Sequence, residues 1–281
     1  MDYLEFYNLN EQPFSNVVDN RFYYNTVQHS EALIRLRYAV DTMKGLAVVV
    51  GDIGTGKTTL ARRMLDELDE AHYEAALLVI LHSSVSSEWL LKKVAMQLGV
   101  RNLKESKVDI LGDLYQRLAA IHEGGKKVAV LIDEAQMLQS KEIMEEFRGL
   151  LNMESPDGKL VTFVFFGLPE LEGLLALDEP LKQRVAVKYR LKALQEDTTG
   201  EYIKHRLRIA GSGDGIFTDT AIHAVHRYSK GIPRLINTIC DNALLEGFLL
   251  KKKMVDKDVI EDVAADLSLE DEKPPIRRFQ V

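Results

Sequence analysis

Residues 51–58 restrict the fold of this chain more than any other part of its sequence. They read Gly-Asp-Ile-Gly-Thr-Gly-Lys-Thr and match the phosphate-binding pattern G-x-x-x-x-G-K-[ST] at every fixed position. An apolar run, residues 46–50, precedes the loop, and a helical pattern over residues 59–65 follows it. Such a loop works between a buried strand and a helix N-terminus, where backbone N–H groups and the helix dipole face the phosphates. The sequence therefore predicts an α/β unit that binds a nucleoside triphosphate.

The loop residues have separate expected roles in binding. Lys57 is expected to reach the β- and γ-phosphates, and the Thr58 hydroxyl is expected to ligate Mg²⁺. Glycines let the backbone approach the phosphates closely. The predicted nucleotide-binding residues are Gly51, Asp52, Ile53, Gly54, Thr55, Gly56, Lys57, Thr58 and Thr59.

A second motif lies downstream, where the apolar residues 128–132 end in Asp133 and Glu134. A continuous apolar run is typical of a strand covered on both faces, and carboxylates at its end are costly unless a cation or water meets them. We expect Asp133 to bind Mg²⁺ and Glu134 to orient and deprotonate the attacking water. The alternative is a strand that runs into an acidic surface loop. The upstream phosphate loop argues against this alternative, because both motifs belong at one edge of one sheet.

Composition limits the class of protein. The chain has 281 residues, of which 46% are apolar, which is enough for one large or two modest cores. Its single cysteine, Cys240, excludes an internal disulfide and has the helical spacing of a buried core residue. No apolar stretch reaches the ~18 residues that span a bilayer, and no signal peptide is present, so a cytoplasmic location is expected. The net charge of −7 argues against a broad nucleic-acid-binding surface.

Strand and helix patterns alternate in the first two thirds of the chain. Strands are expected near 46–50, 76–82, 128–132, 160–166 and 185–191, and helices near 57–69, 87–98, 109–123, 139–152 and 170–177. This alternation predicts a five-stranded parallel sheet with right-handed crossovers. After Leu191 only helical patterns remain, at 196–210, 218–229, 233–249 and 256–266. The expected domains are an N-terminal strap and helix (1–44), an α/β core (45–192), a small all-helical lid (193–267) and a charged tail or linker (268–281).

The N-terminal aromatic segment, residues 6–24, allows two interpretations. It could cover the adenine of a bound nucleotide, or its rings could fill gaps in a core. A helix is expected to follow it, from about residue 30 to residue 43.

Two arginines in the second half of the chain could act on phosphate. Arg184 directly precedes the last predicted strand, where it could face a neighbouring subunit and neutralise transition-state charge in trans. Arg234 follows Pro233, which fits the first turn of a helix, so it could bend toward the γ-phosphate. We expect both to take part in catalysis, although each could also be an ordinary surface residue.

The motifs, in their order, resemble the AAA+ ATPase superfamily. Within it the chain is similar to the secretion-type ATPases of the ExeA/GspA kind, which include the ATPase of mannose-sensitive pilus biogenesis. Besides the phosphate loop, the residues that carry this resemblance are Tyr3-Leu4-Glu5-Phe6-Tyr7 with Pro13-Phe14, His29 with Glu31-Ala32-Leu33, Ile132-Asp133-Glu134-Ala135-Gln136, Leu150-Leu151-Asn152-Met153-Glu154, Gly167-Leu168-Pro169-Glu170-Leu171, Gln183-Arg184 and Gly231-Ile232-Pro233-Arg234-Leu235-Ile236-Asn237.

The resemblance implies a Mg²⁺-dependent ATPase that helps to assemble a secretin or pilus machine in the cell envelope. It further implies that the chain works as a ring or another nucleotide-dependent homo-oligomer, and that envelope partners bring it to the inner face of the inner membrane. Leu168 departs from the family pattern, which often has glutamine there, so no polar sensor is assigned at the end of the fourth strand. Longer relatives continue into a membrane-spanning helix and a peptidoglycan-binding domain, and the sequence leaves open whether this chain is a fragment of such a protein.

Two other functions remain open. A transposition-type AAA+ ATPase that assembles on DNA shares the core motifs, and Lys251-Lys252-Lys253 and Arg277-Arg278 could favour it. Short charge runs are usually solvated, however, and the chain is acidic, so no strong nucleic-acid binding is expected. The third reading is a nucleotide-gated interaction switch that scarcely hydrolyses ATP until a partner supplies an arginine.

Overall fold

The structure is a computed structural model that describes residues 2–101, 105–212 and 215–269. The chain forms two compact units, an α/β unit (Val27–Lys192) and a helical unit (Met1–Thr26 with Ala193–Val281). The division made from the sequence kept residues 1–44 together, whereas the structure separates them after Thr26. Residues 270–281, most of the expected tail with Arg277-Arg278, lie outside the described residues.

The α/β unit is built on one parallel sheet. Its strands are β1 (Leu46–Gly51), β2 (Tyr73–Val79), β3 (Lys127–Asp133), β6 (Thr162–Gly167) and β7 (Val185–Leu191). They lie in the order β2-β3-β6-β1-β7, and every neighbouring pair is parallel. The five-stranded parallel α/β fold predicted from the sequence is confirmed. Because all five strands are parallel, β1 and β3 have their carboxyl ends at the same edge of the sheet, with only β6 between them. The two sequence motifs, which follow β1 and end β3, therefore lie at that edge.

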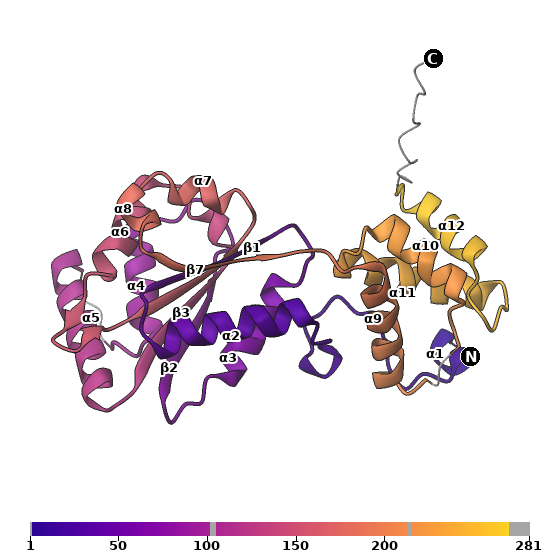
Figure 1. Ribbon diagram of the computed structural model, residues 1–281, viewed down its shortest axis with the longest axis horizontal. Helices are drawn as coiled ribbons and strands as arrows, with labels where there is room; N and C mark the ends of the chain where they lie inside the picture. Colours follow the sequence, from indigo (N-terminus) through magenta and orange to yellow (C-terminus); the bar gives the residue numbers. More distant parts are fainter. Residues whose placement is uncertain (1, 102–104, 213–214, 270–281) are drawn as a thin grey trace, which may run out of the picture. The chain divides into compact units, whose positions relative to one another are not determined.

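Helices cover both faces of this sheet (Figure 1). One face packs against α2 (Val27–Asp41) and α3 (Lys57–Glu67), and the other against α4 (Ser87–Gln97), α5 (Lys107–Glu123), α6 (Lys141–Leu150), α7 (Leu171–Leu175) and α8 (Glu179–Lys182). Strand β1 serves both layers, because Val48 faces the larger core and Val49 the smaller one. The central strands are therefore continuous apolar runs.

Local signals set several element ends, and two elements differ from the expectation. Ser140 caps α6, its hydroxyl accepting a hydrogen bond from the Ile143 N–H at 3.2 Å. The sequence predicted one helix near 170–177, but a second short helix, α8, follows it because the Asp178 carboxylate accepts the Leu181 N–H at 2.9 Å and starts a new turn. A small antiparallel hairpin, β4 (Glu154–Ser155) with β5 (Gly158–Lys159), was not predicted.

The helical unit contains α1 (Tyr3–Tyr7), the 3₁₀ helix η1 (Asn20–Phe22), α9 (Glu196–Ile209), α10 (Asp219–Ser229), α11 (Pro233–Leu249) and α12 (Lys257–Asp266). The helices predicted after Leu191 are confirmed, and Cys240 is fully buried among them. Phe14 and Phe22, from the N-terminal aromatic segment, are buried in the same core. Their burial agrees with the interpretation in which this segment fills a core.

A buried arginine fastens the N-terminal aromatic segment to α9. Arg206 is 6% exposed, and its guanidinium donates to the backbone oxygens of Pro13 at 2.5 Å and Ser15 at 2.9 Å. It also donates to the Tyr202 hydroxyl at 2.8 Å, and it lies over the Phe22 ring. The segment therefore belongs to the helical unit through polar contacts as well as apolar packing.

The chain passes between the units after residue 26 and after residue 192, and one side chain links these two points. The Gln28 amide donates to the Lys192 carbonyl at 2.9 Å and accepts from the Lys192 N–H at 3.0 Å. The first turn of α2 is thereby tied to the end of β7.

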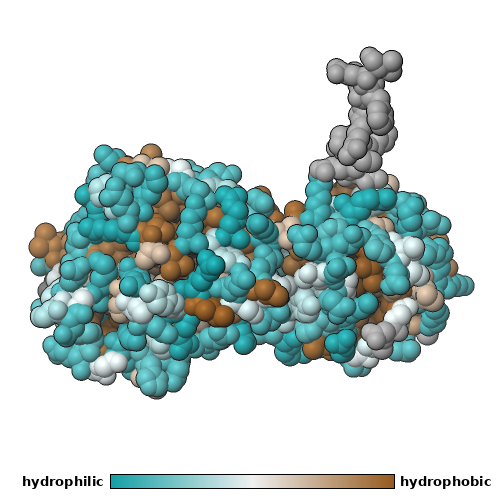
Figure 2. Space-filling view, viewed as in Figure 1, coloured by the Kyte–Doolittle hydropathy of each residue, from teal (hydrophilic) through white to brown (hydrophobic). Residues whose placement is uncertain are grey.

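The visible surface is largely hydrophilic. Figure 2 shows a mostly hydrophilic face with patches of hydrophobic residues on each of the two units. Among the described residues, no helix has both the length and the apolar character needed to cross a bilayer.

Candidate nucleotide-binding site

The loop between β1 and α3 lies at the carboxyl edge of the sheet. Gly54 and Gly56 have φ angles of 79° and 100°, which favour glycine. Gly51 is needed for a different reason, because a Cβ there would lie 2.7 Å from the Leu191 carbonyl oxygen and 2.8 Å from the Thr55 hydroxyl. Helix α3 begins at Lys57, so the last two residues of the phosphate motif lie in its first turn.

Lys57 is folded back onto the loop. Its side chain is buried, and Nζ donates to the carbonyl oxygens of Gly51 and Asp52, both at 2.9 Å. The Thr55 hydroxyl donates to the same Asp52 oxygen at 2.9 Å. These bonds fix the curvature of the loop and hold an ammonium group at its centre, where anions bind at helix N-termini.

Asp133 ends β3 with a buried carboxyl group. Its Oδ1 accepts the Glu134 N–H at 3.0 Å, while Oδ2 is buried and has no hydrogen-bond partner among the residues that the structure describes. Burial raises the pKa of Asp133, and the nearby Thr58 hydroxyl and the Glu134 N–H partly oppose that rise. A buried carboxylate oxygen without a partner, close to a hydroxyl, fits a hard cation such as Mg²⁺.

The described part of the chain has no cluster of three or more His, Cys, Asp or Glu residues that could hold a metal by itself. A cation at Asp133 and Thr58 would therefore need phosphate and water oxygens as its other ligands. This is the usual coordination of Mg²⁺ bound with a nucleotide.

Glu134 stands in a strained backbone conformation and is held by a residue to which the sequence assigned no role. Its φ of 55° is unusual for a non-glycine residue and occurs where the surroundings enforce it. Gln136, which is 7% exposed, donates from its amide to Glu134 Oε2 at 2.5 Å. The same amide accepts the Leu168 N–H at 3.1 Å. In the sequence, the signal for this link was the position of a polar residue, Gln136, two residues after Glu134.

A second residue without an assigned role lies against the loop. His29, on α2, is 6% exposed, and its Nε2 is 3.5 Å from the position that a Cβ on Gly56 would occupy. Burial lowers the pKa of His29 to about 4, so the ring is neutral near pH 7. A neutral ring can pack on the loop without repelling Lys57.

Arg184 lies away from these residues. It precedes β7 and donates to the Arg148 carbonyl at 3.0 Å. Because all strands are parallel, it stands at the amino edge of the sheet, about 20 Å of strand away from the carboxyl edge. Arg234 is exposed in the first turn of α11, in the helical unit. The α/β unit thus brings together Lys57, Thr58, Asp133 and Glu134, and neither arginine joins them within that unit.

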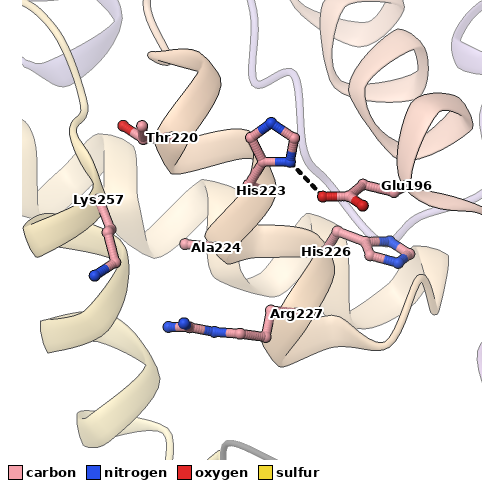
Figure 3. A pocket seen from close by; sticks show the side chains of 7 residues that line it. All are labelled: Glu196, Thr220, His223, Ala224, His226, Arg227 and Lys257. Atoms are coloured by element: carbon pink, nitrogen blue, oxygen red, sulfur yellow. Dashed lines mark hydrogen bonds and ion pairs between the residues drawn. The ribbon is translucent and has the colours of Figure 1, made fainter. Parts of the chain in front are cut away.

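The helical unit has a pocket of about 450 Å³ between α9, α10 and α12 (Figure 3). Its charged side chains are paired with one another or with neighbours. His223 contacts Glu196, while Arg227 and Lys257 both reach Glu261, at 2.9 and 3.0 Å. These pairs connect the three helices, so the charges around the pocket have a structural explanation.

Sequence comparisons relate the chain to known proteins. Residues 40–175 match the model of a family described as AAA domain. General secretion pathway protein A of Aeromonas hydrophila is 36% identical over 249 residues, which cover 88% of this chain and 45% of that protein. An uncharacterized HTH-type transcriptional regulator of Methanocaldococcus jannaschii is 24% identical over 56% of this chain and 39% of its own length. The chain thus spans less than half the length of either relative.

Structural comparisons give the same fold at low sequence identity. The ORC2 protein of Aeropyrum pernix matches with a TM-score of 0.70 and 15% identity, over 92% of this chain and 72% of that one. The RuvB Holliday junction branch migration motor of Thermotoga maritima matches with a TM-score of 0.59 and 19% identity, over 88% and 71%. Likeness at such identity establishes the fold, and the chemistry has to be argued from the site.

Proposed function

From the AAA domain that this chain contains and from its sequence relationship to general secretion pathway protein A, we propose a function in two parts. The protein is a Mg²⁺-dependent ATPase, and it assists assembly of a secretion or pilus machine. The observation that carries the proposal for hydrolysis is the buried Asp133 Oδ2, which has no hydrogen-bond partner among the described residues and lies at the same edge of the sheet as Lys57. The role in assembly rests on the sequence relationship. We further propose that envelope partners recruit the protein to the inner face of the inner membrane.

Each residue of the site has a defined task in this proposal. Lys57 exchanges its two carbonyl partners for phosphate oxygens of ATP, and the loop N–H groups bind the same oxygens. Thr58 and Asp133 would hold Mg²⁺, which neutralises charge on the phosphates when it is bound. Glu134 orients the attacking water and accepts its proton.

The test of this function measures nucleotide affinity and phosphate release in the same variants. Glu134→Gln should keep ATP binding and lose turnover, while Lys57→Ala should weaken both, and Glu145→Gln, an exposed carboxylate on α6, serves as the control. Unchanged turnover in Glu134→Gln excludes that residue from the mechanism. Tight ATP binding without hydrolysis at any protein concentration would favour the nucleotide-gated switch instead.

We also propose that the active form is a homo-oligomer. Arg184 supports this proposal, because it lies at the amino edge of the sheet, far from the phosphate loop of its own subunit, and could therefore act only on a neighbour's nucleotide. Arg184→Ala and Glu134→Gln subunits, each inactive alone, should partly restore activity when mixed. Confirmed association without any restored activity would contradict an arginine supplied in trans. Arg234, in the first turn of α11, is proposed to make the position of the helical unit depend on the nucleotide.

The alternative of action on DNA finds little support in the lysine run 251–253. Lys252 pairs with Asp256 at 2.8 Å, and Lys253 donates to the Phe6 carbonyl and lies over the Phe6 ring. Two of the three lysines at 251–253 therefore already make contacts with other residues of the helical unit. Duplex DNA should therefore bind weakly to the ATP-loaded Glu134→Gln protein. Submicromolar, ATP-stimulated binding that falls steeply between about 50 and 200 mM salt would favour the DNA-based function.

A further inference from the structure

The side chain of Gln136 connects the end of β6 with Glu134. Its amide oxygen accepts the Leu168 N–H at 3.1 Å, and its amide nitrogen donates to Glu134 Oε2 at 2.5 Å. The residues on either side of this link come from different strands, because Glu134 follows β3 and Leu168 follows β6. One buried side chain therefore bridges the carboxyl ends of two neighbouring strands.

The orientation of this amide follows from the chemistry of its partners. A backbone N–H can only donate, so the Gln136 oxygen must face Leu168. The amide NH₂ must then face Glu134, whose ionised carboxylate can only accept. An amide is thus the group that this position requires, since it presents an acceptor on one side and a donor on the other.

The end of β6 leaves space for this amide. A Cβ on Gly167 would lie 3.1 Å from Gln136 Oε1 and 3.3 Å from the Gln136 nitrogen, which is tighter than ordinary contact. Leu168 itself offers no polar side chain, so the backbone N–H is its hydrogen-bonding group toward the site. A polar contact between β6 and the catalytic carboxylate exists here through Gln136.

We propose that Gln136 is a positioning residue that holds Glu134 for water activation and makes that position depend on the end of β6. This inference rests on the proposed ATP hydrolysis. With Oε2 fixed by the amide, the other carboxylate oxygen, Oε1, is the one that accepts the proton of the attacking water. Since Glu134 also has a strained backbone conformation, the amide limits the freedom of its side chain beyond that turn.

Three variants separate the two halves of the link. Gln136→Ala removes both hydrogen bonds, whereas Gln136→Glu can still accept the Leu168 N–H but, when ionised, cannot donate to Glu134. Gln139→Ala is the matched control, because Gln139 is an exposed glutamine of the same loop. For each protein, the turnover at saturating ATP, the ATP dissociation constant and the hydrogen exchange rate of the Leu168 amide are measured.

Turnover should fall about ten- to a hundredfold in Gln136→Ala and in Gln136→Glu, because this is the loss in rate that corresponds to one hydrogen bond to a charged group. The ATP dissociation constant should change by less than about twofold, because the hydrogen bonds of Gln136 go to Glu134 and Leu168 rather than to the phosphate loop. The Leu168 amide should exchange faster in Gln136→Ala and remain protected in Gln136→Glu.

Full turnover in Gln136→Glu would overturn the inference, even if Gln136→Ala fails to fold. An equal loss of ATP affinity and turnover would also overturn it, because that pattern indicates general damage to the site. If the unaltered protein neither binds nor hydrolyses ATP, the proposed function fails together with this inference. Normal hydrolysis by the unaltered protein with equally active variants refutes the role of Gln136 alone.

Discussion

Asp133→Asn should stabilise the protein in the absence of nucleotide, although it removes a functional group. The carboxylate is 1% exposed, and Oδ2 has no hydrogen-bond partner within the described part of the chain, so its negative charge is poorly compensated. Leaving one buried polar group unsatisfied costs about 1–3 kcal/mol, and more when the group is charged. The amide of Asp133→Asn still lacks a partner but carries no charge, so we take the removable, charge-dependent part of the cost to be about 1–3 kcal/mol. For a unit of this size, each kcal/mol corresponds to about 2–4 °C. We therefore expect the melting temperature of the variant to rise by roughly 2–12 °C.

The pH dependence provides an independent check on the cause. Burial raises the pKa of Asp133 above its ordinary value of 3.8, so the folded protein binds this proton more tightly than the unfolded chain does. This tighter proton binding stabilises the folded protein. The stabilisation is fully present below the ordinary pKa of 3.8 and is lost as the pH rises through the raised pKa of the folded protein. The stability of the variant relative to the parent should therefore be largest at a pH above the raised pKa of Asp133, and it should shrink as the pH falls toward the ordinary value of 3.8.

Thermal unfolding followed by circular dichroism measures both effects, with the exposed Glu123→Gln on α5 as the control. Excess ATP with Mg²⁺ should stabilise the parent by about 2.7 kcal/mol at a hundredfold excess over the dissociation constant, and stabilise Asp133→Asn less. A nucleotide-free Asp133→Asn protein that melts at or below the parent temperature would refute this reasoning.

Three further changes test other parts of the structure. Gly51→Ala places a β-carbon 2.7 Å from the Leu191 carbonyl oxygen, so it should destabilise the protein by about 1–3 kcal/mol and weaken ATP binding. A stability in urea and an ATP affinity equal to those of the parent would contradict the close approach of the loop to Leu191. Arg206→Met leaves two carbonyl oxygens of the N-terminal aromatic segment without their donor, so it should cost about 2–4 kcal/mol and speed proteolysis within residues 6–24; an unchanged cleavage rate argues against this anchor. The pKa of His29 is lowered to about 4, so its contribution to the free energy of unfolding is present above the ordinary value of 6.5 and is lost as the pH falls toward 4. His29→Gln should therefore lose less stability in acid when unfolding is measured against pH, and a pH profile identical to that of the parent would refute this role of His29.

Local patterns were sufficient where chemistry depends on consecutive residues. The phosphate loop, the buried strand before Asp133 and the helices after Leu191 all follow from spacing and periodicity over about ten residues. The fold class follows as well, because alternating strands and helices permit few arrangements other than a parallel sheet. The boundary after Thr26 did not follow, since it depends on rings that are buried in a core formed mainly by residues after Ala193.

The sequence by itself was sufficient to predict which residues bind phosphate and metal, because a short motif carries its own backbone geometry. Only the tertiary structure decided how these residues are supported. The contacts of Gln136 with Leu168 and of Gln28 with Lys192 join residues that are far apart in the chain. The insertion of β6 between β1 and β3 brings the first pair together. Periodicity within a segment carries no information about which distant segment packs beside it, since that choice depends on the burial of the whole core.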